Sequence, residues 1–181
     1  AVITCCGRFS LQGDSLLEQS REEIDGAALA LAEAGARHLL EIRCKDVSDP
    51  AFLEELAHGL VKSGLAMCLS GTSRPASGSE HKISHSIDHL FPPCKGLHGE
   101  QVGISTLFTM ALQGNALLDR VQQFYAWIGF PSTLGHLNLT ADEFTRAVGN
   151  ASRIRPQRYT ILEHTRPTES RIKAIIESLS L

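Results

Sequence analysis

The sequence has no long apolar run and no block of basic residues. No stretch approaches the roughly 20 uninterrupted apolar residues that a membrane span requires, and the apolar run near Ala1 is too short for a signal peptide. The formal net charge is -3, which leaves no electrostatic footprint for nucleic acid or an anionic membrane. We therefore expect a cytoplasmic protein with no nucleic-acid partner and no membrane insertion.

The cysteines lack the pattern of a structural framework. The chain has five of them, an odd number with no Cys-x-x-Cys pair: Cys5, Cys6, Cys44, Cys68 and Cys94. This argues against both a disulfide framework and a zinc ribbon. Because free cysteine is often buried, we expect reduced thiols in or near the core.

Alternation of strand with helix is the third pattern that the sequence lacks. Apolar residues instead return at helical spacing between Gly, Pro and capping signals. They predict seven or eight helices, over residues 21–42, 50–69, 79–90, 100–112, 117–128, 140–151 and 168–179, with one potential strand at Tyr159–Leu162. A chain of 181 residues, 43% of them apolar, can bury one substantial core. The pattern therefore favours an all-α helical bundle.

Histidine is concentrated in one part of the chain, with His81, His85, His89 and His98 close together. On a helix, residues four apart lie on one face, so the first three form a stripe. His98 follows a Pro-Pro turn and belongs to a second element. Imidazoles that converge from two elements can bind a first-row dication, although the same spacing also occurs in a solvent-facing or hydrogen-bonded histidine face.

The residues around these histidines form a longer signature. Gly71-Thr-Ser-Arg-Pro-Ala-Ser-Gly-Ser-Glu-His-Lys-Ile-Ser-His-Ser-Ile-Asp88 is followed by Leu97-His-Gly-Glu-Gln-Val-Gly103. Together they resemble the sn-glycerol-1-phosphate dehydrogenase family, within the superfamily of iron-type alcohol dehydrogenases, glycerol dehydrogenases and dehydroquinate synthases. A tail similar to Arg158-Tyr-Thr-Ile-Leu162 also recurs in that family. The resemblance implies the metal-binding C-terminal domain of a dehydroquinate synthase-like fold.

The resemblance also implies roles for the histidines. His81 and His98 correspond to metal ligands. His85, one turn from His81, corresponds to the catalytic residue that meets the substrate and relays its proton. His89 has no implied role, and we interpret it as a surface histidine at the helix end.

Polar residues on either side of the histidines are further candidates. Ser73, Arg74 and Ser77 offer a cation and hydroxyls near a helix N-terminus, which suits the binding of a substrate phosphate; the alternative is a capping loop. Glu100 could orient His98 by accepting its second N–H, or it could be a carboxylate favoured by the dipole at a helix start.

Two parts of the family pattern are missing from residues 1–181. The third metal ligand of the family is an aspartate, which we expect upstream of Ala1; Asp14 follows a glycine as that ligand does, but it stands closer to His81 than the family pattern requires. No Gly-rich strand-to-helix turn for a dinucleotide is present. We therefore expect the N-terminal nucleotide-binding domain, with the residues that bind NAD(P), outside this chain.

The implied reaction is the interconversion of dihydroxyacetone phosphate and glycerol 1-phosphate with NAD(P), a step of phospholipid biosynthesis acting on a small phosphorylated substrate. Zn²⁺ is the default metal for such ligands, with Ni²⁺ and Fe²⁺ as alternatives. One alternative function is a metal-dependent cyclase of the dehydroquinate synthase type, in which an Asn stands where this chain has Gly78. The other is a non-catalytic binding module that lacks its partner domain. Whether the chain forms a homo-oligomer stays open.

Overall fold

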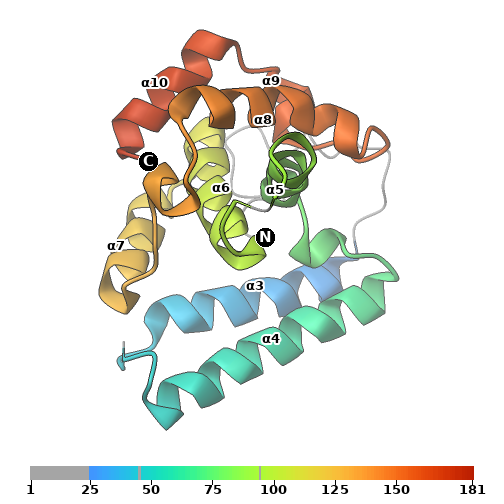
Figure 1. The fold of residues 1–181 in the computed structure, drawn as a ribbon. Coiled ribbons are helices and arrows are strands. Elements are labelled where there is room, and N and C mark those ends of the chain that lie inside the picture. Colours follow the sequence, from blue (N-terminus) through green and yellow to red (C-terminus); the bar gives the residue numbers. More distant parts are fainter. Residues whose placement is uncertain (1–24, 45, 94) are drawn as a thin grey trace.

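The computed structural model describes residues 25–44, 46–93 and 95–181. Within these ranges the chain forms eight α-helices and two 3-10 turns and contains no strand (Figure 1). In chain order the elements are α3 (Gly26–Glu41), α4 (Pro50–Ser70), η2 (Arg74–Ala76), α5 (Ser79–Leu90), α6 (His98–Gln113), α7 (Leu118–Ile128), η3 (Leu134–Leu137), α8 (Ala141–Ile154), α9 (Ile161–Thr165) and α10 (Glu169–Leu179). The predicted all-α fold is confirmed.

Most helices begin where the sequence provides a cap. Asp49 accepts a hydrogen bond from the Ala51 amide at the start of α4, and Thr140 does the same for the Glu143 amide at the start of α8. The helix predicted over 21–42 is observed from Gly26, and residues 21–24 lie outside the described ranges.

One secondary-structure prediction is wrong. The potential strand at Tyr159–Leu162 is the start of helix α9. Thr160 and Glu163 form a reciprocal capping box, in which the Glu163 carboxylate accepts the Thr160 amide at 2.7 Å. Such a box commits the chain to a helical turn, although β-branched and aromatic residues at this point favour a strand.

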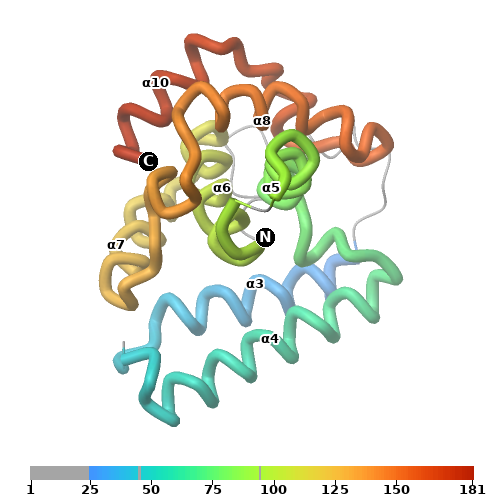
Figure 2. Tube along the Cα trace, in the orientation of Figure 1, coloured from blue at the N-terminus to red at the C-terminus, as the bar shows by residue number. Residues whose placement is uncertain are grey.

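The main core lies between α5, α6, α8 and α10. Ile83, Ile104 and Phe144 are completely buried there, and the Phe108 and Phe144 rings meet edge to face with centroids 5.5 Å apart. Figure 2 shows α8 and α10 lying over one side of α5 and α6. The histidine-bearing helices are therefore fixed by the best-packed part of the molecule.

Helices α3 and α4 form a separate pair beneath this core (Figure 1). Their axes approach closely at Gly35 and Gly59, where a Cβ built on Gly35 would lie 3.1 Å from the Gly59 carbonyl oxygen. Only glycine permits this approach without a shift of the backbone. The pair ends at Gly71, whose left-handed φ of 63° turns the chain toward η2 and α5.

Two further expectations can be compared with the described residues. None of the described helices combines the length and apolar character needed to cross a bilayer.

Cys44 is partly buried and Cys68 is exposed, both as free thiols, so the expectation of a core position is wrong for Cys68. Cys5, Cys6 and Cys94 lie outside the described residues.

Candidate metal and substrate site

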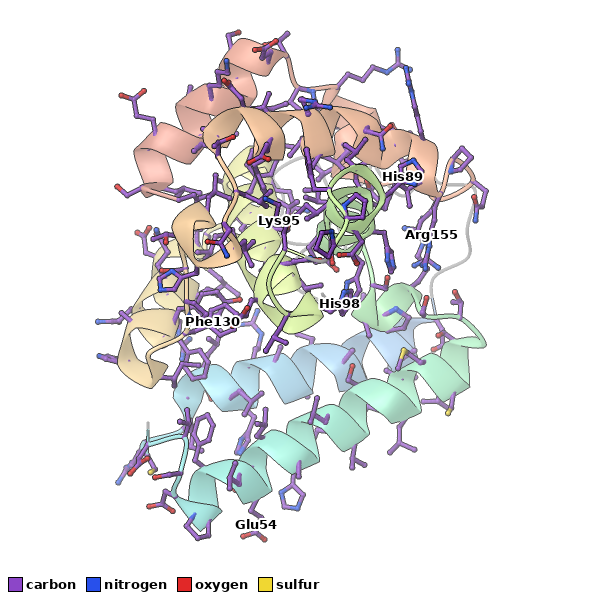
Figure 3. All side chains as sticks on the ribbon, viewed as in Figure 1. Glu54, His89, Lys95, His98, Phe130 and Arg155 are labelled. Carbon is purple, nitrogen blue, oxygen red and sulfur yellow. The ribbon has the colours of Figure 1, made fainter. Side chains whose placement is uncertain are left out.

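Three of the four clustered histidines come together where the first two turns of α5 meet the start of α6. The ring centroids of His81 and His98 are 5.4 Å apart, and those of His85 and His98 are 5.7 Å apart. His98 is the first residue of α6 rather than part of the preceding turn. His89, further along α5, is exposed (Figure 3), and its surface position agrees with our interpretation of it.

His81 is oriented by the residue that precedes it. Glu80 is fully buried, and its Oε1 accepts the Gly78 amide at 2.7 Å and lies 2.8 Å from Nδ1 of His81. Because a carboxylate accepts hydrogen bonds, Nδ1 carries the proton. The lone pair of His81 is therefore on Nε2.

His98 is oriented by a chain of buried polar side chains. Ser84 donates its hydroxyl proton to Oε1 of Gln101 at 2.6 Å, so its oxygen can accept from Nδ1 of His98, 2.9 Å away. Gln101 in turn donates to Asp88 at 2.8 Å and to the Lys95 carbonyl at 3.1 Å. This series of hydrogen bonds places the proton of His98 on Nδ1 and leaves the lone pair on its Nε2.

His85 has a different environment. Nη2 of Arg155 donates to Nε2 of His85 at 3.2 Å, and a guanidinium only donates. Nε2 is therefore the accepting atom of a neutral imidazole. Burial lowers the pKa of His85, and the positive charge of Arg155 lowers it further, which favours the same neutral form.

Two further arginines join the turn before α5 to the segment that follows α8. Nη1 of Arg158 donates to the Ser77 carbonyl at 3.0 Å and Nη2 to Oγ of Ser73 at 3.1 Å. Arg74, in η2, donates to the Tyr159 carbonyl at 2.8 Å. Arg74 and Ser77, which the sequence suggested for substrate binding, thus lie beside the segment that brings in Arg155 and Arg158.

Sequence reasoning did not single out Arg155 or Arg158 for the site. They lie far along the chain from the histidines, and only the packing of α8 against α5 brings them close. The one available signal was the resemblance of the tail that begins at Arg158, which was noted without a role.

Glu100 accepts the Leu97 amide at 2.9 Å through Oε2, in the geometry of a helix-capping carboxylate. The partner of Nδ1 in His98 is Ser84 instead.

Asp14 lies outside the described residues. Among the residues that the structure describes, no set of three or more His, Cys, Asp or Glu side chains is arranged to hold a metal. His81 and His98 thus fit as two donors of a site that needs at least one more.

Comparison with known proteins finds no matching family model but does find curated relatives. The chain is 38% identical over 143 residues to a protein of Staphylothermus marinus, 41% identical over 138 residues to one of Hyperthermus butylicus and 34% identical over 148 residues to one of Nitrosopumilus maritimus. These alignments cover 78%, 75% and 82% of this chain and 40%, 38% and 41% of the relatives. Each relative is named glycerol-1-phosphate dehydrogenase (NAD(P)+). The chain spans about 40% of the length of the first of these relatives.

Proposed function

Since this chain is a homologue of the C-terminal portion of the glycerol-1-phosphate dehydrogenase family, we propose that it is the metal- and substrate-binding half of an NAD(P)-dependent oxidoreductase. The whole enzyme would interconvert dihydroxyacetone phosphate and glycerol 1-phosphate. The observation that carries the proposal is the pair of convergent imidazoles, His81 and His98, each with its Nε2 lone pair free. NAD(P) would be bound by an N-terminal domain outside residues 1–181, and residues 1–181 would make up one metal-binding domain.

His81 and His98 would hold the metal through their Nε2 atoms, with a carboxylate from outside the described residues as a third ligand. A dication bound there would polarise the substrate carbonyl and stabilise a developing alkoxide. Zn²⁺ suits two imidazoles, a carboxylate and an open position; Ni²⁺ and Fe²⁺ suit them as well. Glu80 and Ser84 would keep the two rings in orientation before and after metal binding.

Arg155 is the group best placed for the substrate phosphate. Among the described residues its guanidinium contacts His85 and forms no ion pair with a carboxylate. A phosphate would supply the missing countercharge through a bidentate contact. Arg74 and Ser77 border the same segment and remain our candidates for further substrate contacts.

His85 would move the substrate proton. When Arg155 turns to the phosphate, Nε2 of His85 is released as a base. In the direction of alcohol oxidation it would take the hydroxyl proton while hydride leaves for NAD(P)+. In the direction of reduction the resulting imidazolium would return that proton to the oxygen.

Neither alternative function is favoured. The cyclase would predict Asn at the position of Gly78, and the curated relatives are named as dehydrogenases. A non-catalytic module would show no turnover even with a metal bound at the two histidines. Mixing the intact enzyme with NADH and dihydroxyacetone phosphate separates these functions, because only a dehydrogenase consumes NADH.

The roles of the histidines can be tested by substitution in the intact enzyme, including its nucleotide-binding portion. His81→Ala and His98→Ala should lose the metal, because the remaining protein donors hold a dication poorly against water. His85→Asn should keep the metal while kcat falls by on the order of 10²–10⁴, the usual contribution of a positioned acid or base. Elemental analysis measures the metal content, and NADH absorbance measures the turnover.

His89→Ala is the matched control on the same helix and should change neither metal content nor kcat. If His85→Asn lost the metal while His81→Ala retained it, the two roles would have to be exchanged. Absence of NADH oxidation by the intact, metal-loaded wild type would refute the proposed activity.

A further inference from the structure

The largest fully buried side chains of the described residues include a lysine. Lys82 follows His81 on α5, and its side chain is 1% exposed. Nζ donates to Oε1 of Glu163 at 2.6 Å and to the Arg158 carbonyl at 2.9 Å. A buried ammonium is costly unless it is paired and hydrogen-bonded, so this geometry has to be maintained for the helix to pack as it does.

Both partners of Lys82 belong to one segment, residues 155–163, which connects the end of α8 to α9. The Arg158 carbonyl lies near its middle and Glu163 at its end, so one ammonium fixes the segment at two points. Glu163 is also the capping carboxylate of α9, accepting from the amide and the hydroxyl of Thr160 at 2.7 Å each. The anchor therefore sets both the position of the segment and the start of the next helix.

The same segment begins with Arg155, the residue that donates to His85. Two further contacts that tie the segment to the turn before α5 involve Arg74 and Arg158, whose side chains are partly exposed. Lys82 lies beneath them with almost no exposed surface. Because the desolvated ion pair tolerates little change in geometry, it restricts the segment more than the outer hydrogen bonds do.

We propose that Lys82 is a positioning residue: its buried ion pair with Glu163 and its hydrogen bond to the Arg158 carbonyl hold segment 155–163 against α5, and thereby place the Arg155 guanidinium at His85. The consequence for substrate binding rests on the proposed function, in which Arg155 binds the phosphate. Lys82 itself touches neither the substrate nor the metal.

Hydrogen exchange of the intact protein tests the positioning directly and needs no substrate. Lys82→Met keeps most of the length of the side chain and removes its charge. The amides of residues 157–163 should then exchange at least about tenfold faster, while those of Ile104 and Phe108 in α6 should be little changed. Unchanged protection of segment 155–163 would overturn the inference.

Lys173→Met is the matched control. Lys173 forms ion pairs of similar length, 2.8 Å with Asp142 and 2.9 Å with Glu169, but its side chain is 45% exposed and lies on α10. Its loss should leave segment 155–163 protected. If Lys82→Met fails to fold, Glu163→Gln decides instead, because Gln keeps the volume and the capping oxygen while it removes the ion pair.

Kinetics of the intact enzyme separate positioning from general stabilisation. Lys82→Met should raise KM for dihydroxyacetone phosphate by about tenfold or more, the scale of one lost hydrogen bond to a charged group, with a smaller change in kcat. KM for dihydroxyacetone, which has no phosphate, should be unaffected. An equal rise in KM for both substrates would contradict a role that acts through Arg155.

A double-mutant cycle completes the test. If Lys82 acts through Arg155, adding Lys82→Met to Arg155→Gln should raise KM no further, and fully additive effects would overturn the inference. The two proposals fail separately: a wild type without turnover refutes the proposed activity, whereas the hydrogen-exchange result still decides whether Lys82 positions the segment.

Discussion

The two imidazoles proposed as metal ligands are held by different kinds of acceptor. His81 donates to a fully buried carboxylate, Glu80, whereas His98 donates to a hydroxyl, Ser84, that is itself fixed by Gln101. A carboxylate behind a ligating imidazole increases the basicity of the ring as well as fixing its orientation. We therefore expect His81 to be the stronger donor of the pair.

Substitution of Glu80 tests this difference. Glu80→Gln can keep the hydrogen bond but removes the charge, and the metal affinity of the intact enzyme should fall on the order of tenfold. The measurement is a competition titration against a chromophoric chelator. Glu100→Gln is the matched control, because Glu100 caps α6 and does not contact Nδ1 of His98. A larger loss of affinity in the control would return Glu100 to the orienting role.

Some of these residues could be predicted from the sequence and others could not. The shared face of His81 and His85 follows from helical spacing alone, and His98 was expected from a second element. Their partners Ser84, Gln101 and Arg155 could not be found in this way, because those contacts depend on how α5, α6 and α8 dock. Glu80 was within reach, since it adjoins His81, but its burial became evident only from the packing.

At the scale of single helices, capping explains most of the observed boundaries. In α8, Thr140 accepts the Glu143 amide at 3.2 Å, and Glu143 returns the bond by accepting the Thr140 amide at 2.8 Å. The hydrogen bond from the Thr140 amide lowers the pKa of Glu143, as expected when the charged form is the hydrogen-bonded one. This helix carries the buried Phe144 and leads into Arg155, so its start matters for both the core and the site.

Thr140→Ala should destabilise the protein by about 1 kcal/mol, the typical cost of losing an N-cap oxygen. Thr140→Ser keeps that oxygen and should cost much less. Urea denaturation of the two variants beside the wild type measures the difference. Equal losses of stability in both would indicate that the methyl group of Thr140, and not its hydroxyl, is the important part.

The boundaries show where local signals suffice. The helix predicted over 79–90 is observed as Ser79–Leu90 because Gly78 and the Pro-Pro turn limit it on both sides. The helix predicted from Glu100 begins two residues earlier, at His98, because Glu100 is the third residue of the helix, where it closes the capping box, rather than the first. The strand predicted at Tyr159–Leu162 is wrong for the same kind of reason, because Thr160 and Glu163 form a capping box there.

At the scale of the whole molecule, the described helices divide into a core of large side chains and the pair α3 and α4, which is joined to α6 through the packing of Leu40 on Leu107 and Met110. The core of α5, α6, α8 and α10 is built from large side chains such as Phe108 and Phe144. The buried cluster shared by α3 and α4 consists of Ala28, Leu29, Ala32 and Ala66. Helix α4 also carries large exposed apolar side chains, with Leu60 65% exposed. The small cluster buries little apolar surface, so it should contribute less to stability.

Native-state hydrogen exchange at increasing urea concentration should therefore resolve two levels of opening. Amides of α4 should exchange through an opening that costs at least about 2 kcal/mol less than the opening that exposes the amides of α6. Ala66→Gly should lower the first level and leave the second nearly unchanged, since Ala66 is completely buried between α3 and α4. A single opening free energy for both helices would show instead that they unfold together.

The anchoring of segment 155–163 also has a consequence for the synthesis of the chain. Glu163 lies 81 residues after Lys82, so a ribosome releases the histidine-bearing helices long before the carboxylate that neutralises Lys82. A premature stop codon within α8 would yield a polypeptide that retains His81, His85 and His98 but leaves Lys82 without its countercharge. Burial of α5 in such a product would carry the cost of an unpaired charge, so we expect that helix to be more accessible to cellular proteases. The buried lysine thus makes stable folding conditional on complete translation through Glu163.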